Sequence, residues 1–233
     1  MTRKVMLISG TSKGIGRHLA EHYLSRGFEV IGCSRNELKL DSSHYKHFSL
    51  SITNESAVTD MFSSIRQEYG RLDYLINNAA INPAISPALL TPLSTVRKTL
   101  EVNFLGSFLL STEAVKLMMK NRFGRIVNFS SMAASHHVAG ETAYTSSKAA
   151  IVAFSRIFAK EIYRFGITCN VVSPAAVPTE LSAAVNEQAL KEVLKRNAIP
   201  KFGTLEEVAH TIDYLIDDKS TAITGQTVHL GGV

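Results

Sequence analysis

Short apolar runs alternate with longer amphipathic stretches along the whole chain. Residues 5–8 are continuously apolar and stop at Ser9 and Gly10, as a strand buried on both faces of a sheet does. Apolar residues then recur at helical spacing from about Gly14, until Gly27 ends the pattern. The same reasoning predicts strands at residues 28–33, 44–50, 72–76, 125–129, 167–172 and 227–230, and helices at 54–69, 94–120, 142–165 and 205–216.

This alternation predicts an α/β fold, a doubly wound Rossmann-type parallel sheet flanked by helices on both faces. No repeat, low-complexity tract or linker interrupts it, so residues 1–233 are expected to form a single domain. Two segments break the alternation. Residues 81–92 carry three prolines and are expected to be irregular, and residues 175–200 form a long excursion that is expected to contain a helix and to act as a lid.

The predicted helices at 94–120 and 142–165 are apolar on more than one face. One face of each covers the sheet. The additional apolar residues have two explanations: they form a subunit interface in a homotetramer (or homodimer), or each helix lies deeper in the monomer. The pattern alone does not choose between them.

Charge and cysteine content narrow the class of protein. The net charge is +5 but the positive residues are scattered, so we expect no nucleic-acid partner. No apolar run approaches the roughly 20 residues that span a bilayer, and the chain enters its first strand without a signal-peptide pattern. Cys33 and Cys169 lie in apolar runs typical of buried thiols in a reducing compartment. We therefore expect a cytoplasmic protein that does not associate with membranes.

A glycine-rich turn follows the first predicted strand and opens the first helix. Its glycines allow close backbone approach, and the free N–H groups of the helix N-terminus attract an anion. This context favours phosphate binding over plain turn chemistry, although the spacing is G-x-x-x-G-x-G and not the commoner G-x-G-x-x-G. The candidate phosphate-binding residues are Gly10, Ser12, Lys13, Gly14, Ile15 and Gly16.

The end of the second predicted strand bears on the choice of nicotinamide cofactor. An NAD site would carry an acidic residue there for the ribose 2′-hydroxyl, but this chain has Ser34 and Arg35. Arg35 can clamp a 2′-phosphate, Ser34 can donate to it, and Lys13 can add charge from the turn. The alternative is that both cations simply face solvent. NADP(H) is the better interpretation.

A third chemical pattern lies in residues 131–148. A helix that begins near Thr142 places Tyr144 and Lys148 one turn apart, on one face. A phenol pKa near 10 is too high for proton exchange at neutral pH, and a neighbouring cation lowers it. Ser131 adds a hydroxyl thirteen positions before Tyr144. Taken alone, the Tyr–Lys pair could also be two surface residues of a helix with no catalytic function.

Together these residues resemble the short-chain dehydrogenase/reductase family over essentially the whole chain. The order and spacing of the motifs carry the resemblance, since no single motif would. The matching residues are Gly10, Gly14, Gly16, Asn77, Asn78, Ala79, Asn103, Ser131, Tyr144, Lys148, Asn170, Ser173, Pro174 and Thr179. The chain departs from the family pattern at Ser9, Ser51, Ala80 and Ala175.

The resemblance implies a role for each catalytic residue. Tyr144 would protonate the substrate oxygen, and Ser131 would hold that oxygen. Lys148 would lower the phenol pKa and bind the nicotinamide ribose. Asn103 would sit at a local helix distortion and hold a water that links Lys148 to solvent. The cofactor residues implied are those of the glycine turn together with Ser34, Arg35, Asn78, Ala79, Tyr144, Lys148, Pro174, Val177 and Thr179, so that residues 1–130 mainly bind cofactor and residues 131–233 supply catalysis and substrate binding.

Within the family the C-terminal part is similar to bacterial 3-oxoacyl-(acyl-carrier-protein) reductases. The implied activity is NADPH-dependent reduction of a 3-oxoacyl thioester or another small hydrophobic ketone. Acyl carrier protein is a possible partner: Arg122 matches one of the arginines that meet it near the active-site mouth, and Arg164 is one residue away from the other. A non-catalytic regulator that senses NADP(H) is the alternative class. Such proteins typically lose the Tyr or the Lys, and this chain keeps both.

Substrate contacts are expected from His136, His137 and Leu181. The two histidines are adjacent and point in different directions, which makes a poor metal pair without a third ligand, so we expect no metal. They either line the substrate cleft or belong to a plain loop. The sequence does not name the substrate.

Overall fold

The computed structural model describes residues 3–180, 182 and 193–232. Its centre is a seven-stranded sheet in the order β3-β2-β1-β4-β5-β6-β7, in which every neighbouring pair is parallel. The doubly wound fold predicted from the sequence is confirmed. The strands are β1 (Val5–Ser9), β2 (Glu29–Ser34), β3 (Tyr45–Ser49), β4 (Tyr74–Asn77), β5 (Gly124–Phe129), β6 (Ile167–Ser173) and β7 (Thr227–His229).

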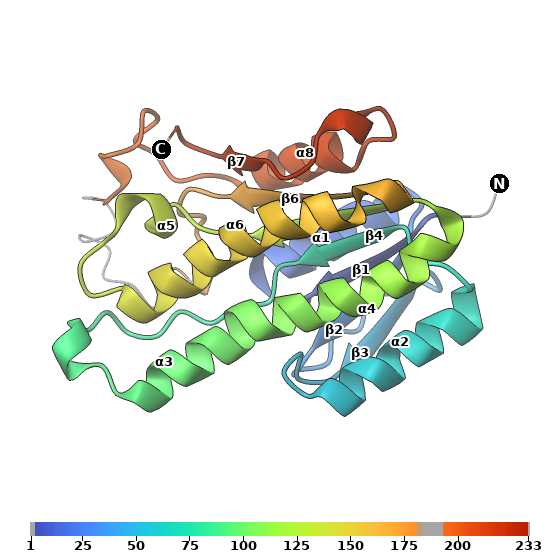
Figure 1. The fold of residues 1–233 in the computed structure, drawn as a ribbon, viewed down its shortest axis with the longest axis horizontal. Helices are drawn as coiled ribbons and strands as arrows, with labels where there is room; N and C mark the ends of the chain where they lie inside the picture. The colour runs from blue at the N-terminus through green and yellow to red at the C-terminus, as the bar shows by residue number, and fades with distance from the viewer. Residues whose placement is uncertain (1–2, 181, 183–192, 233) are drawn as a thin grey trace.

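Helices cover both faces of the sheet (Figure 1). Helices α2, α4 and α6 pack on one face, and α1 and α8 pack on the other. Because both faces are covered, the central strands β1, β4, β5 and β6 are buried along their whole length. The main helices are α1 (Gly14–Ser25), α2 (Glu55–Tyr69), α3 (Leu93–Leu100), α4 (Gly106–Asn121), α5 (Ala133–His136), α6 (Thr142–Ile162) and α8 (Leu205–Ile216). Short helical turns are η1 (Ala88–Leu90), η2 (Glu101–Leu105), η3 (Tyr163–Phe165) and η4 (Ser220–Ala222).

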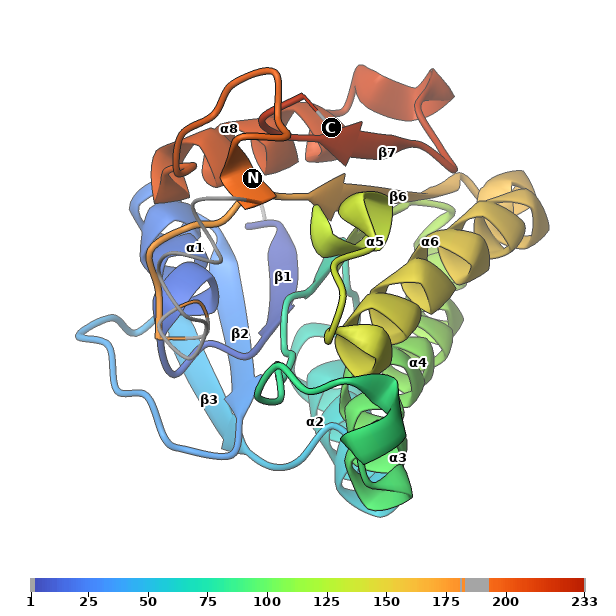
Figure 2. The ribbon, with the colours of Figure 1, turned by 90° about the vertical axis from the view of Figure 1, so that its left-hand side faces the viewer.

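The strand order reverses beside β1. The chain first builds outward through β2 and β3, then returns to place β4 on the other side of β1 and continues to β7 (Figure 2). In such a sheet the connections leave β1 and β4 in opposite directions and open a crevice at the carboxyl ends of these strands. This edge of the sheet is where a ligand site is expected.

The predicted helix at 94–120 is not continuous. The π-helical turn η2 separates α3 from α4, so that Asn103 lies in a distorted segment of backbone. A π-turn inside a helix often marks a functional site. The apolar pattern did not predict it, since apolar residues continue on both sides of the turn.

The other differences are small. The segment at 81–92 contains only the single turn η1, the short helix α5 follows β5, and the last turn of the predicted helix at 142–165 is the 3₁₀ turn η3. The helix expected within residues 175–200 falls largely outside the described residues. In the described parts of the chain, no helix is long and apolar enough to cross a membrane.

Candidate active site

Tyr144 and Lys148 lie on the first two turns of α6, and both side chains are buried. The Lys148 ammonium donates to the backbone carbonyl of Phe129 at 2.9 Å, at the carboxyl end of β5. The hydroxyl of Ser130 donates to the Lys148 carbonyl at 3.2 Å, which ties the helix to the same strand end. Ser131 follows directly. The sheet and one helix therefore bring the three predicted groups together.

Burial shifts both titrating groups away from their charged forms. It raises the pKa of Tyr144 to about 12, against a smaller lowering by a hydrogen bond with Ser131. It lowers the pKa of Lys148 to about 8. Desolvation outweighs the lowering influence, so the net shift of the phenol pKa is upward, and the expected lowering by Lys148 stays a prediction. At neutral pH Tyr144 is a neutral phenol that carries a proton to give.

The side chain of Asn103 is fully engaged within the protein. Its carbonyl oxygen accepts from the Ile81 N–H at 2.8 Å, and its amide donates to the Ile81 carbonyl and to the Ser147 hydroxyl at 2.9 and 3.0 Å. The distortion expected at this residue is present. The contacts connect the π-turn, the segment after β4 and helix α6. The side chain thus positions α6, and its role in a proton relay stays a prediction.

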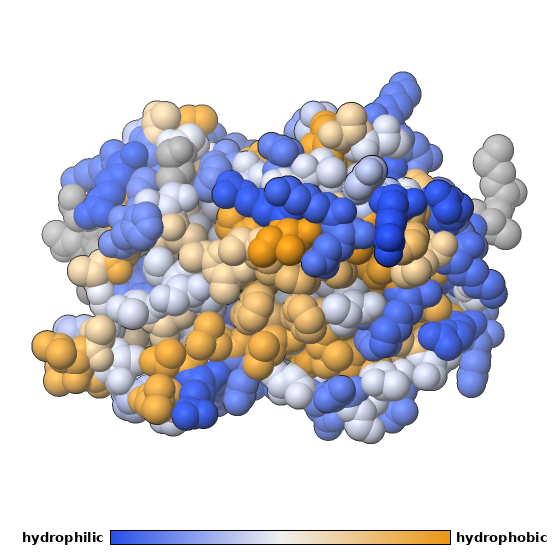
Figure 3. All heavy atoms as spheres, viewed as in Figure 1, coloured by the Kyte–Doolittle hydropathy of each residue, from blue (hydrophilic) through white to orange (hydrophobic). Residues whose placement is uncertain are grey.

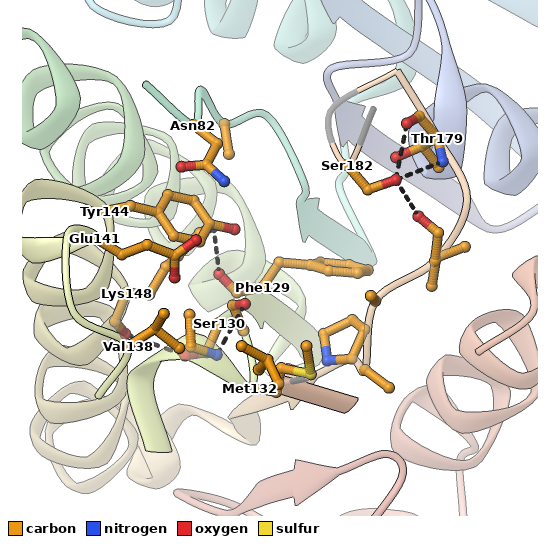
Figure 4. Close-up of a pocket in the computed structure, with 18 of the residues that line it drawn as sticks. Asn82, Phe129, Ser130, Met132, Val138, Glu141, Tyr144, Lys148, Thr179 and Ser182 are labelled. Atoms are coloured by element: carbon orange, nitrogen blue, oxygen red, sulfur yellow. Dashed lines mark hydrogen bonds between the residues drawn. The ribbon is translucent and has the colours of Figure 1, made fainter. Parts of the chain in front are cut away.

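One cavity joins these groups to the nucleotide end of the sheet (Figure 4). Ser131, Tyr144 and Lys148 line it. Figure 4 shows Tyr144 and Lys148 across the cavity from Thr179 and Ser182, which follow β6. Of the residues predicted to bind cofactor, Ile15, Asn78, Pro174, Val177 and Thr179 also line this cavity.

The glycine turn is shaped for close backbone approach. Gly10 has a positive φ of 77°, and a Cβ there would come within 2.8 Å of the Ala79 Cα. A Cβ at Gly16 would lie 2.2 Å from the Gly10 carbonyl oxygen. Lys13, at the N-cap of α1, makes no side-chain cap, so its side chain leaves the helix N–H groups free for an anion. The turn therefore forms a cradle that larger residues would fill.

Ser9 fixes this turn against β4. Its hydroxyl accepts from the backbone N–H groups of Asn78 and Ala79, each at 3.1 Å. The Asn78 amide returns hydrogen bonds to the carbonyls of Ser9 and Gly10 at 3.0 and 3.2 Å. The serine therefore performs this bridging with its hydroxyl, although the family usually has threonine at this position.

The end of β2 carries Ser34 and the exposed cation Arg35, and no acidic side chain. The Ser34 hydroxyl donates to the Asn36 carbonyl at 2.6 Å and lies 3.3 Å from His47 Nε2. Sequence reasoning missed His47. The available signal was its place on β3, which pairs with β2 so that His47 lies opposite Gly32, two residues before Ser34.

The structure places the predicted substrate residues differently. The His136 ring is held by the side chain of Asn197 at 2.6 Å, and His137 ends α5 with a positive φ of 50°. Neither lines the cavity. Leu181 lies outside the described residues. Sequence reasoning missed Glu141 and Asn82, which do line the cavity.

The two arginines expected near the active-site mouth are also elsewhere within this chain. Arg122 precedes β5 and donates to the backbone carbonyl of Arg164, which precedes β6, at 3.1 Å. Both therefore lie at the amino ends of parallel strands, whereas Tyr144 lies at the carboxyl ends. A single protomer does not bring them to its own cavity.

A doubly wound sheet with a glycine cradle and a Ser–Tyr–Lys set in a cavity at its switch point defines a dinucleotide-dependent oxidoreductase. Residues 10–232 match the family model described as enoyl-(acyl carrier protein) reductase. The chain belongs to the short-chain dehydrogenase/reductase family, and it is an enzyme that acts on CH–OH or C=O groups.

Relatives and solved structures agree with this assignment. The chain is 32% identical to 3-oxoacyl-[acyl-carrier-protein] reductase FabG of Escherichia coli (strain K12), over 98% of this chain and 96% of the relative. The Haemophilus influenzae enzyme of the same name is 31% identical, over 100% and 98%. The structure of ElxO with NADP bound superposes with a TM-score of 0.89 at 29% identity and covers 98% and 97% of the two chains. The structure of 4-hydroxyisoleucine dehydrogenase complexed with NADH gives 0.88 at 29% identity, over 99% and 98%.

Proposed function

We propose that the protein is an NADPH-dependent carbonyl reductase whose substrate is a 3-oxoacyl thioester. One observation carries the chemistry: Ser131, Tyr144 and Lys148 line one cavity at the switch point of the sheet. The name shared by the curated relatives supports the acyl thioester and an acyl carrier protein as the partner that delivers it. The alternative substrate is another small hydrophobic ketone.

The described residues fit a dinucleotide with a 2′-phosphate. The cradle at Gly10 and Gly16 and the uncapped amino end of α1 suit a pyrophosphate. Arg35 is an exposed cation directly after β2, where an NAD site would carry an acid, and Lys13 is an exposed cation in the glycine turn. The neighbour ElxO was solved with NADP, whereas 4-hydroxyisoleucine dehydrogenase was solved with NADH, so Arg35 is the residue that argues for NADP(H).

Tyr144 acts as the general acid. When bound, NADPH supplies the hydride that reduces the carbonyl carbon. Tyr144 gives its phenolic proton to the carbonyl oxygen, so that the ketone becomes a secondary alcohol and the phenol becomes a phenolate. Its raised pKa keeps the phenol protonated at neutral pH. General acid catalysis of this kind contributes about 10²–10⁴-fold.

Ser131 and Lys148 support this transfer. The Ser131 hydroxyl holds the substrate oxygen and donates to the charge that develops on it. Lys148 is an ammonium below pH 8, and its charge stabilises the phenolate left after proton transfer. Asn103 holds α6 in the orientation that keeps both groups in the cavity.

The test is NADPH oxidation with an acetoacetyl thioester, comparing the natural chain with Tyr144→Phe. We expect the variant to bind NADPH and to lose at least about 100-fold in kcat. Tyr163→Phe, which removes an exposed phenol outside the cavity, is the matched control and keeps full activity. Equal rates for Tyr144→Phe and the natural chain would reject the mechanism.

A further inference from the structure

The cavity contains a carboxyl group that the proposed reaction does not use. Glu141 is the N-cap residue of α6, three positions before Tyr144, and it lines the cavity. Its side chain makes no capping hydrogen bond, and it has no hydrogen-bond or ion-pair partner among the described residues. It is neither fully exposed nor fully buried. A half-buried carboxyl group without a partner is costly to keep unless a ligand uses it.

A second acceptor lies on the same wall. Asn82 follows β4, and its side-chain carbonyl oxygen is buried without a hydrogen-bond partner among the described residues. Figure 4 shows the Asn82 amide and the Glu141 carboxyl group on either side of the Tyr144 ring. Two elements far apart in the sequence thus direct unpaired acceptors into the cavity beside the catalytic phenol.

In the described part of the chain, few charged side chains line the cavity. Among the described residues that line the cavity, Lys148 is the other charged side chain, and its ammonium donates to Phe129. Among the described residues, Glu141 therefore has no cation as an ion-pair partner. Glu141 is half-buried, and this burial raises the pKa of its carboxyl group.

We propose that Glu141 and Asn82 form a specificity subsite for a hydrogen-bond donor on the substrate, beside the catalytic phenol. The subsite rests on the carbonyl reduction proposed above and narrows its substrate class. It favours ketones that carry a hydroxyl or amide N–H, and it disfavours anionic ketones and purely alkyl ones. In a 3-oxoacyl thioester the donor is an amide N–H of the carrier arm.

The physical reason is the asymmetry of hydrogen bonding. A donor that reaches the subsite satisfies acceptors that are already desolvated, whereas an alkyl group of the same size leaves them unpaired. A site built to bind a hydroxyl rejects the analogue that lacks it far more strongly than an apolar pocket rejects an extra methylene. The subsite therefore selects substrates that carry a hydrogen-bond donor.

The experiment compares substrates of matched shape. The first pair is 4-hydroxy-2-butanone and 2-pentanone, which differ by a hydroxyl in place of a methyl group. The second pair is acetoacetyl-N-acetylcysteamine, which has an amide N–H, and its S-alkyl analogue, which has none. The measured quantity is the ratio of kcat/KM within each pair, for the natural chain, Glu141→Gln and Glu141→Leu.

We expect the natural chain to prefer the donor-bearing member of at least one pair by roughly tenfold or more, the factor that a hydrogen bond to a charged group supplies. Glu141→Gln keeps an acceptor and retains part of the preference, and Glu141→Leu abolishes it. The pair that responds distinguishes a hydroxyl from a carrier-arm amide. Glu161→Gln, an exposed position at the far end of α6, leaves both ratios unchanged.

The two proposals fail in different ways. If the natural chain reduces none of the four compounds with NADPH, carbonyl reduction is wrong. If it reduces them with ratios near one, or with ratios that Glu141→Gln and Glu141→Leu leave unchanged, the subsite is wrong and carbonyl reduction stands. A purely structural role for Glu141 would lower all four rates together and leave the ratios intact.

Discussion

At the scale of single residues, burial decides the chemistry. Tyr144 and Lys148 are recognisable in the sequence by their spacing, and the expected interaction between them is a cation that lowers a phenol pKa. In the folded chain both side chains are buried. Desolvation raises the pKa of Tyr144 and lowers the pKa of Lys148, so it favours the neutral form of each. The degree of burial depends on residues distant in sequence, so the spacing could not give it.

Replacement of Lys148 by methionine is expected to stabilise the protein at neutral pH while it removes activity. The folded pKa of about 8 lies below that of an unfolded lysine, so protonation favours the unfolded chain. This loss of stability is complete below pH 8 and disappears as the pH rises toward the unfolded pKa. The shift corresponds to about 3 kcal/mol, and the lost hydrogen bond to Phe129 offsets about 1 kcal/mol of it.

Denaturant unfolding at two pH values checks this expectation. Lys148→Met should exceed the natural chain by about 2 kcal/mol in the free energy of unfolding at pH 7. The difference should shrink at pH 10. The exposed Lys39→Met serves as control and should show no such pH dependence. A Lys148→Met variant that is less stable at pH 7 would contradict the desolvation argument.

Arg35 is expected to select the cofactor. Arg35→Ala should weaken NADPH binding by about 2 kcal/mol or more, because a charge-assisted contact to the 2′-phosphate is lost, and should leave NADH binding nearly unchanged. Titration of both cofactors by fluorescence measures the two affinities. Lys39→Ala removes a cation from the same connection and should affect neither. An equal loss for both cofactors would show that Arg35 does not bind the 2′-phosphate.

At the scale of elements, the interruption between α3 and α4 was the principal feature hidden from the sequence pattern. Apolar spacing predicts one helix over residues 94–120, and the structure has a π-turn at Glu101–Leu105 inside it. The turn places Asn103 against the backbone of Ile81 and against Ser147 of α6. This junction is decided by three segments meeting, so no local periodicity could reveal it.

Replacement of Asn103 by leucine is expected to disrupt this junction. The variant leaves the N–H and the carbonyl of Ile81 without their partner, so the protein should lose about 2–4 kcal/mol in the free energy of unfolding. Activity should fall with it, since α6 carries Tyr144. Denaturant unfolding and circular dichroism measure the change. Asn121→Leu, at the exposed end of α4, is the control, and an Asn103→Leu variant as stable as that control would refute the junction's importance.

At the scale of the whole molecule, an apolar surface remains on the side covered by α4 and α6 (Figure 3). We call it the α4–α6 face: Leu105, Phe108 and Ile157, which are 51%, 44% and 60% exposed. Phe104 and Phe154 lie beside it in a cluster of aromatic rings. These helices have a buried face toward the sheet and a second apolar face toward solvent, so the apolar residues of the second face are not buried within the monomer. The homotetramer stays a prediction.

A double substitution on this face should prevent assembly. Phe108→Asp with Ile157→Asp places two charges on the α4–α6 face, and burying them in an interface would cost several kcal/mol. Light scattering at micromolar concentration should report a tetramer (or dimer) for the natural chain and a lower mass for the variant. Leu89→Asp, which is 98% exposed on η1, should leave the mass unchanged. A monomeric natural chain would reject the assembly.

The sequence by itself determined the strand and helix order, the glycine cradle, the lack of an acid at the end of β2 and the spacing of the catalytic set. These features are local, since they depend on periodicity, turn chemistry and fixed offsets along one element. Only the tertiary structure decided which groups share the cavity. The fold brings Glu141 and Asn82 into the cavity with Tyr144, and it holds the His136 ring against the side chain of Asn197. Burial in the fold also shifts the pKa values of Tyr144 and Lys148. Contacts and desolvation arise between segments distant in the chain, and no single stretch of sequence contains them.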